Sequence, residues 1–434
     1  MRLRNINEQV MVITGATSGI GLTTARMAAE KGAQLLLIAR NEEALAELCN
    51  EINSNGGRAI YYAADVADER SLRDAAYKAL TELGRIDTWV NNAGVAMYGK
   101  LTDVLEEDSR RLFETDFWGV VAGSRVAVEH LRDNGGALIN VGSEVSDMVV
   151  PLLGMYCAAK HAVKGFTDTL RMEVEADKFP ISVTLIKPTA IHTPFPENAK
   201  NYMPFEPKLP PPVYAPELVA EAIIHCAQHP TRDFFVGEMA AAHSAMANYT
   251  PRMNDRVMEM IGESSQDSGI PADDARRDGL HQTNSDLRER GSMDRFVMET
   301  SVYQKAKMHP MLTAGLLAGG GLALAAFLGR RMTKTDGFDR TAPMKLDDDR
   351  VSMRGALVGD GLDISEHMEV VGSDGQHVGV VDKVIDGRIK LTRNDPMAEG
   401  RHHLLPMNMV EAVESKRVRL NLTAEEAKAS WQPA

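Results

Sequence analysis

The chain has 434 residues, of which 44% are hydrophobic, and this length exceeds that of one ordinary domain. Its net charge of -13 argues against nucleic acid as the main partner. Three cysteines, Cys49, Cys157 and Cys226, lie far apart without disulfide or metal-ligand spacing, which favours a reducing compartment and no metal site. The N-terminal segment lacks the apolar stretch of a secretory signal, so we expect a cytoplasmic location.

The first 250 residues alternate short apolar runs with helical patterns, which is typical of an α/β fold with a doubly wound parallel sheet. Ligands of such sheets bind beyond the carboxyl ends of the strands, where this chain has its polar and glycine residues. Six runs rich in valine, isoleucine and leucine predict strands buried on both faces, at 10–15, 34–40, 59–65, 88–94, 137–143 and 181–188.

A glycine-rich turn, TGATSGIG, follows the first predicted strand and precedes the helical pattern LTTARMAAEKG. Glycine lets a ligand approach the backbone closely, and amides at a helix N-terminus favour a pyrophosphate. A glycine triplet alone is typical of any tight turn, but strand, turn and helix in this order indicate a Rossmann-type nucleotide site. The predicted contacts are Gly15, Thr17, Ser18, Gly19, Ile20 and Gly21.

The second predicted strand ends at Arg40, where an enzyme that prefers NAD usually has an acidic residue for the ribose hydroxyls. Arginine favours a 2'-phosphate, so the sequence predicts NADP rather than NAD as the cofactor. The alternative is that Arg40 is a solvated residue after a strand. Asp65 ends the third strand and is expected to accept a hydrogen bond from the adenine amino group.

Ser143, Tyr156 and Lys160 carry the predicted chemistry. Tyrosine and lysine four residues apart share one face of a helix, and a nearby ammonium favours the phenolate form of a tyrosine. Ser143, at the end of a predicted strand, can donate to an oxygen that gains negative charge as hydride arrives. A tyrosine and a lysine at this spacing also occur by chance in many helices, but the turn and the serine make chance a poor explanation here.

With these motifs the sequence resembles the short-chain dehydrogenase/reductase family over about residues 5–240. The resemblance rests on TGATSGIG, on Asp65 and Val66 as the adenine contact, on NNAG at 91–94, and on YCAAK. It implies that Ser143 orients the substrate, that Tyr156 transfers the proton, and that Lys160 binds the nicotinamide ribose and lowers the tyrosine pKa. Further cofactor contacts that it implies are Asn92, Ala93, Gly94, Tyr156, Lys160, Pro188, Thr189 and Thr193.

One position departs from the family pattern, because Asp116 stands in FETDFWGVV where the family usually has asparagine. In the family that residue helps to hold a water linked to the lysine, partly through its backbone carbonyl, which an aspartate also presents. The alternative is that the carboxylate pairs with Lys160 and weakens its effect on Tyr156. We therefore count Asp116 among the candidate catalytic residues.

A proline-rich segment follows the sixth strand and carries Phe195, Tyr202, Met203, Phe205 and Tyr214. Its apolar side chains predict a cover over a hydrophobic carbonyl or alcohol substrate. The alternative is that they pack against a partner subunit, and the resemblance implies a homo-oligomer.

Residues 251–308 are rich in charge and contain few apolar residues, so we expect a linker there. The next segment, 309–330, contains 18 uncharged residues at 311–328, four of them glycine. It allows a membrane span or shallow insertion, or a glycine-rich helix buried against another subunit. A span is opposed by the basic residues that follow it, Arg330, Arg331 and Lys334, since positive charges prefer the cytoplasmic side.

Beyond a second linker at 331–359, residues 360–434 show valines at alternate positions and turn signals at 373–375 and 386–387. This pattern predicts a small β domain and resembles a bacterial PRC-barrel-like module, which would mediate assembly or localisation. Neighbouring His402 and His403 would face opposite ways on a strand, so we assign them no metal.

These features predict an NADP-dependent oxidoreductase that interconverts a carbonyl and an alcohol on a small apolar substrate. A second interpretation is a nucleotide-binding regulatory or scaffold protein that acts through its C-terminal module. A third, an epimerase or dehydratase of the same fold, is less favoured because no motif indicates a sugar-nucleotide site. Substrate identity cannot be predicted, since specificity in this fold depends on a variable segment.

Overall fold

The computed structural model describes two parts of the chain. The first comprises residues 2–273, 276–283, 287–293 and 295–309, and the second comprises 364–366, 368–385, 388–393, 395, 398, 401–414, 417–429 and 431–433. Each part belongs to its own compact unit. The apolar stretch 311–328 and the linker at 331–359 lie outside the described residues.

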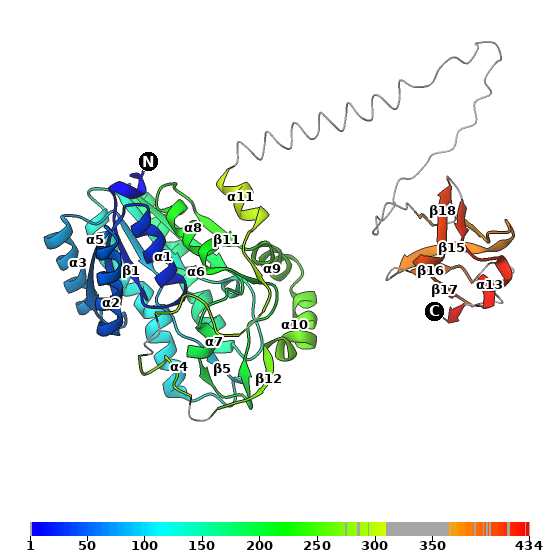
Figure 1. The fold of residues 1–434 in the computed structure, drawn as a ribbon, viewed down its shortest axis with the longest axis horizontal. Helices are drawn as coiled ribbons and strands as arrows, with labels where there is room; N and C mark the ends of the chain where they lie inside the picture. The colour runs from blue at the N-terminus through cyan, green and yellow to red at the C-terminus, as the bar shows by residue number, and fades with distance from the viewer. Residues whose placement is uncertain are drawn as a thin grey trace, which may run out of the picture. The chain divides into compact units, whose positions relative to one another are not determined.

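The first unit is built on a seven-stranded parallel sheet, drawn from blue to green in Figure 1, with the order β11-β7-β6-β4-β1-β2-β3. The strands are β1 Val10–Thr14, β2 Gln34–Ala39, β3 Arg58–Ala63, β4 Thr88–Asn91, β6 Gly136–Val141, β7 Ile181–Pro188 and β11 Asp233–Val236. The six predicted strands are confirmed, as is the doubly wound fold. The sequence reasoning missed the short β11, which pairs with β7.

Helices cover both faces of this sheet. One face buries apolar side chains of α1, α2 and α8, and the other buries those of α3, α5 and α6. Their bounds are α1 Gly19–Glu30, α2 Glu42–Ser54, α3 Glu69–Leu83, α5 Gly119–Leu131, α6 Gly154–Ala176 and α8 Pro216–Cys226. The strands β1, β2, β4, β6 and β7 are almost wholly buried, as their continuous apolar runs require, whereas the edge strands β3 and β11 are partly exposed.

The strand order reverses between β1 and β4, which places the carboxyl ends of these two strands at the edge where such sheets bind ligands. The side chain of Asn91, at the end of β4, links this strand to β6 and α5. Its amide donates to the Asn140 side chain of β6 at 2.8 Å and to the Ser124 hydroxyl of α5 at 3.1 Å. These buried hydrogen bonds fix the strand ends that carry the candidate site.

Shorter elements surround that edge. They include the helices α4 Glu106–Phe113 and α7 Phe195–Asn198, the π-helical turn Glu114–Trp118 and the 3-10 turn Glu144–Ser146. Short strands pair as β5 Met97–Tyr98 with β8 Lys200–Asn201, β9 Phe205–Pro207 with β12 Asp267–Pro271, and β10 Val213–Tyr214 with β13 Val297–Met298.

The segment expected as a linker, 251–308, differs from that expectation because much of it folds onto the first unit. It contains α10 Pro251–Gln266, β12, β13 and α11 Val302–Met308, and it follows α9 Glu238–Tyr249. The low apolar content of this segment does not prevent it from folding, because buried polar side chains make contacts with the rest of the first unit. Gln304 is 1% exposed, and its amide donates to the Leu218 carbonyl of α8 at 2.7 Å. Gln266 is fully buried and donates to the Pro151 carbonyl.

The second unit contains a seven-stranded sheet of order β18-β19-β14-β15-β16-β17-β20, in which all pairs except β14 with β19 are antiparallel. Its elements are β14 Glu369–Val371, β15 His377–Ile385, β16 Arg388–Leu391, β17 His403–Pro406, β18 Val410–Glu414, β19 Arg417–Leu420, α13 Ala424–Ala429 and β20 Gln432–Pro433. The expected small β domain is therefore present. Within the described ranges, no helix is long and apolar enough to cross a membrane.

Candidate active site

The glycine-rich turn that joins β1 to α1 depends on glycine at two positions. Gly15 has a φ of +65°, which favours glycine, and a Cβ at Gly21 would lie 2.1 Å from the Gly15 carbonyl oxygen. Asn92 supports the turn from β4, since its amide donates to the Thr14 carbonyl at 2.9 Å. The Thr14 hydroxyl in turn accepts from the backbone N–H groups of Asn92 and Ala93, both at 3.0 Å.

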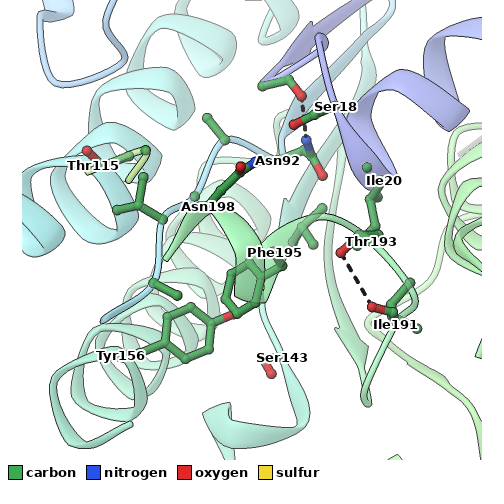
Figure 2. Close-up of a pocket in the computed structure, with 18 of the residues that line it drawn as sticks. Ser18, Ile20, Asn92, Thr115, Ser143, Tyr156, Ile191, Thr193, Phe195 and Asn198 are labelled. Atoms are coloured by element: carbon green, nitrogen blue, oxygen red, sulfur yellow. Dashed lines mark hydrogen bonds between the residues drawn. The ribbon is translucent and has the colours of Figure 1, made fainter. Parts of the chain in front are cut away.

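A cavity of about 290 Å³ runs along the carboxyl edge of the sheet and unites most of the predicted site. Figure 2 shows Ser143, Tyr156 and Phe195 in this pocket, with Ser18 and Asn92 on its other side. The predicted residues that line it are Gly15, Thr17, Ser18, Gly19, Ile20, Arg40, Asp65, Val66, Asn92, Ala93, Gly94, Ser143, Tyr156, Lys160, Pro188, Thr189 and Thr193. Gly21 and Asp116 do not line it, because Gly21 packs behind the turn and Asp116 is fully buried.

Ser143 and Tyr156 approach each other from different elements. Ser143 lies two residues beyond the end of β6 and caps the turn 144–146. Its hydroxyl accepts a hydrogen bond from the Val145 N–H at 3.3 Å. Tyr156 lies in the first turn of α6, and its ring packs edge-on against Phe195 with 5.3 Å between ring centroids. Loss of solvent raises the pKa of Tyr156 well above its ordinary value, and the Asp116 charge raises it further. A hydrogen bond with the Ser143 side chain opposes both effects on this pKa.

Lys160 lies one helical turn beyond Tyr156 and points to the same side of α6. Its ammonium donates to the Val141 carbonyl at 3.3 Å and lies 5.5 Å from the centre of the Tyr156 ring. Only 5% of the Lys160 side chain is exposed. The ammonium is therefore weakly solvated, and a charge in such a place interacts with its neighbours more strongly than a charge in water.

The Asp116 carboxylate lies beside the Lys160 ammonium. Its Oδ2 lies 3.4 Å from the Lys160 Nζ, and its Oδ1 accepts from the Val95 N–H at 2.7 Å. Burial raises the pKa of Asp116, while the neighbouring Lys160 ammonium acts in the opposite direction. Asp116 sits in the π-helical turn 114–118, which extends the helix of α4 toward α5 and brings the carboxylate behind the cavity wall. Of the two alternatives at this position, the geometry favours the pair with Lys160.

Arg40 lies at the other end of the cavity, after β2. Its guanidinium donates to the carbonyl oxygens of Leu280 at 3.2 Å and Gln282 at 3.0 Å, and also to that of Gly279. Burial lowers the pKa of Arg40, which remains a strong base, and the nearby Asp65 opposes this shift. Arg40 is thus neither a free solvated side chain nor wholly available to a ligand.

Asp65 also has partners within the chain. Its Oδ1 accepts from the Ala67 N–H at 3.0 Å, and its Oδ2 pairs with the Arg111 guanidinium. The Arg111 Nε–H donates to the Leu280 carbonyl at 3.2 Å. This end of the cavity is therefore lined by the Arg40 guanidinium and by Asp65, whose charge is paired with Arg111 outside the lining.

The proline-rich segment contributes to the cavity less than expected. Phe195 lines it, whereas Met203 is buried, and Tyr202 donates to Asp108 on α4. Tyr214 is fully buried and donates to Glu238 at 2.7 Å. Phe205 packs in the same apolar cluster as Met203 but does not line the cavity.

Sequence reasoning missed the other residues around the substrate end of the cavity. Most come from segments far apart in the chain and belong to no local motif, whereas Asn198 and Leu209 lie in the proline-rich segment that the sequence predicts as a cover. They include Tyr98, Val145, Val150, Leu153, Asn198 and Leu209, and the extension adds Gly279 and Thr283 at the Arg40 end.

No group of three or more histidine, cysteine, aspartate or glutamate side chains is arranged to hold a metal ion in the parts of the chain that the structure covers. In the second unit, His403 stacks on Trp431, and the His402 ring contacts the Leu391 carbonyl. Both histidines thus have structural partners.

The sequence profile of the family described as short chain dehydrogenase matches residues 9–203. A second profile, described as an uncharacterized protein conserved in bacteria (DUF2171), matches residues 364–428. Both matches fall where the structure has a compact unit.

Individual proteins resemble the chain as well. The uncharacterized oxidoreductase YxnA of Bacillus subtilis is 44% identical over 322 residues, which are 74% of this chain and 90% of that protein. A match of this length necessarily takes in the extension 251–308. The putative oxidoreductase SadH of Mycobacterium tuberculosis is 34% identical over 192 residues, 44% of this chain and 70% of that protein. A short chain dehydrogenase/reductase of Burkholderia phymatum, solved in complex with NAD, has the same fold, with a TM-score of 0.52 at 23% identity, covering 58% of this chain and 96% of that one.

Proposed function

This chain belongs to the short-chain dehydrogenase/reductase family and is an NAD(P)-dependent oxidoreductase, and we propose that it uses NADP to interconvert a carbonyl and an alcohol on a small apolar substrate. The observation that carries the proposal is a single cavity that holds Ser143, Tyr156 and Lys160 at one end and Arg40 at the other. A protein that only bound a nucleotide would not need Ser143, Tyr156 and Lys160 beside an apolar part of the cavity.

The residues fit a dinucleotide. The close packing at Gly21 leaves no room for a side chain, so a pyrophosphate could approach the backbone amides of the turn other than the Gly19 N–H, which donates to the Arg288 carbonyl. Arg40 would face the adenosine end, with Arg111 behind it on Asp65, and Thr189 and Thr193 would face the nicotinamide end. The bound cofactor supplies or accepts the hydride.

The chain's own residues handle the proton. Ser143 and the Tyr156 hydroxyl hold the substrate oxygen, and Tyr156 gives its proton to that oxygen in reduction or removes it in oxidation. Burial raises the pKa of Tyr156 in the cofactor-free chain, so its hydroxyl carries the proton that reduction requires. Lys160 favours the phenolate, and Asp116 cancels part of that effect.

The substrate class follows from the chamber beside Tyr156. Its lining residues Tyr98, Val150, Leu153, Phe195 and Leu209 present mainly carbon atoms. The Glu144 carboxylate that also lines the cavity pairs with His243, and an anionic substrate would lose its hydration without a basic partner in this chamber, so we propose apolar aldehydes, ketones or quinones.

The test uses the full-length protein with NADPH and NADH against a panel of such compounds. Tyr156→Phe should lose at least about a hundredfold in kcat and still bind NADPH, because only the proton donor is removed. Tyr62→Phe is the matched control, since Tyr62 lies in β3 and does not line the cavity. Persistent activity in the Tyr156 variant would refute the mechanism.

Cofactor choice has its own test. If Arg40 recognises the 2'-phosphate, kcat/KM with NADPH exceeds that with NADH, and Arg40→Ala lowers this ratio. A wild-type preference for NADH would refute the assignment.

For the second unit, we propose a PRC-barrel-like module that mediates assembly or localisation of a homo-oligomeric cytoplasmic enzyme, supported by its separate β fold. The stretch 311–328 keeps its two alternatives. Release from membranes by carbonate would exclude a span, and retention would exclude burial against another subunit.

A further inference from the structure

The extension beyond α10 crosses the open side of the cofactor cleft. We call residues 276–283 and 287–293 the strap. Gly279 and Thr283 of the strap line the same cavity as Gly15 and Ser143. The family profile ends at residue 203, so nothing in the shared motifs accounts for this segment.

The first attachment of the strap is at the adenosine end. Arg40 donates to three strap carbonyls, those of Gly279, Leu280 and Gln282. A guanidinium has five N–H groups, so two of them, the Nε–H and one Nη1–H, are left for a ligand. Arg40 can therefore hold the strap and an anionic group together.

The second attachment is apolar. Leu280 is fully buried in a cluster with Val95, Met97, Leu112 and Ala159, directly behind the cavity wall. Fixing a segment of irregular backbone costs conformational entropy, and a buried leucine is the kind of anchor that offsets this cost. The buried Leu280 side chain thus anchors the strap to the first unit.

The third attachment lies over the N-terminus of α1. The Gly19 N–H donates to the Arg288 carbonyl at 2.9 Å, next to the amides that would face a pyrophosphate. The Arg288 side chain pairs with Glu197 of α7 at 2.9 Å, and Glu197 also accepts from the Ser292 N–H at 2.6 Å. The strap thereby joins the phosphate turn to the helix that carries Phe195.

We infer that the strap is the outer wall of the cofactor site and that the dinucleotide leaves only when the strap detaches. This inference rests on the proposed use of a nicotinamide cofactor. Residues of the strap line the cavity but do not fill it. This is expected of a segment that covers a bound cofactor rather than one that occupies the place of the cofactor. A 2'-phosphate that takes the remaining Arg40 donors would strengthen the same attachment, so NADPH is released more slowly than NADH.

Stopped-flow fluorescence of NADPH bound to the full-length protein measures this release. Leu280→Ala removes the buried anchor and should accelerate NADPH release at least tenfold, without slowing association. Ile270→Ala is the matched control, because Ile270 lies in β12 of the same extension, is 54% exposed and does not line the cavity. Its release rate should equal that of the wild type.

His281→Ala provides a second, milder variant in case Leu280→Ala does not fold. His281 is exposed and contacts Asp108 on α4, so its loss should also accelerate release, by a smaller factor. Unchanged release in a folded strap variant would overturn the inference. Faster association with unchanged release would overturn it too, because the strap would then occupy the place of the cofactor. Failure of the wild type to bind either NADPH or NADH would instead refute the proposed function.

Discussion

Asp116→Asn should move the pH dependence of the reaction to lower pH. The carboxylate and the Tyr156 ring lie on either side of Lys160, at 3.4 Å and 5.5 Å from its Nζ. The carboxylate oxygen and the centre of the Tyr156 ring are thus separated by at most about 9 Å, and two unit charges at that distance and an effective dielectric constant of about 20 interact by ~1.8 kcal/mol, or roughly 1.3 pH units. Asparagine keeps an oxygen for the Val95 N–H and removes only the charge. Without that charge, Tyr156 loses its proton more readily.

The assay is kcat/KM for alcohol oxidation with NADP between about pH 6 and pH 11, in which the rate rises as Tyr156 becomes a phenolate. The midpoint should fall by about one pH unit in Asp116→Asn, and the affinity for NADPH should stay unchanged. Asp147→Asn is the control, because it breaks another buried pair, with Lys187 at 2.8 Å, and neither residue of that pair lines the cavity. A midpoint that stays in place, or moves equally in both variants, would show that the Asp116 charge does not act on the tyrosine.

Three further changes have defined outcomes. Gly21→Ala places a methyl group 2.1 Å from a backbone oxygen of the turn and should weaken NADPH binding at least tenfold in a fluorescence titration, whereas Gly165→Ala, with open space around it, should not. His243→Ala removes a pair with Glu144 at 2.8 Å that raises the pKa of His243. That stabilisation is present below the unfolded pKa of about 6.5 and is lost as pH rises through the higher folded value, so the Tm difference from wild type should be larger at pH 5.5 than at pH 8.5. Phe195→Ala opens the apolar chamber and should raise KM for apolar ketones about tenfold with a smaller effect on kcat; an equal loss for polar and apolar substrates would contradict this role.

The parts of the site that could be predicted depend on short stretches of sequence. The turn at Gly15 to Gly21 needs glycine because of contacts within the turn and with one neighbouring strand. Tyr156 and Lys160 are related by a single helical turn, and Ser143 lies two residues beyond β6, whose apolar run is obvious. Each of these signals is local, so a sequence pattern is sufficient to find it.

The chamber and the extension could not be predicted in the same way. Leu153 and Leu209 meet only through the tertiary fold, and either one alone looks like an ordinary core residue. The polar composition of the extension 251–308 predicts a linker. Its buried Gln266 and Gln304 satisfy their amides on backbone carbonyls of distant elements, which no count of apolar residues reveals.

Arg40 shows how a correct local signal can still give an incomplete account of function. Its position after β2 suggests 2'-phosphate recognition, but three of its five donors hold strap carbonyls. Loss of this side chain therefore weakens the wall over either cofactor and removes a phosphate contact from NADPH alone. Arg40→Ala should consequently accelerate release of NADH as well as NADPH, whereas a residue that served only the 2'-phosphate would leave NADH release unchanged. Release rates thus separate the two roles of one side chain, which the NADPH-to-NADH ratio of kcat/KM alone cannot do.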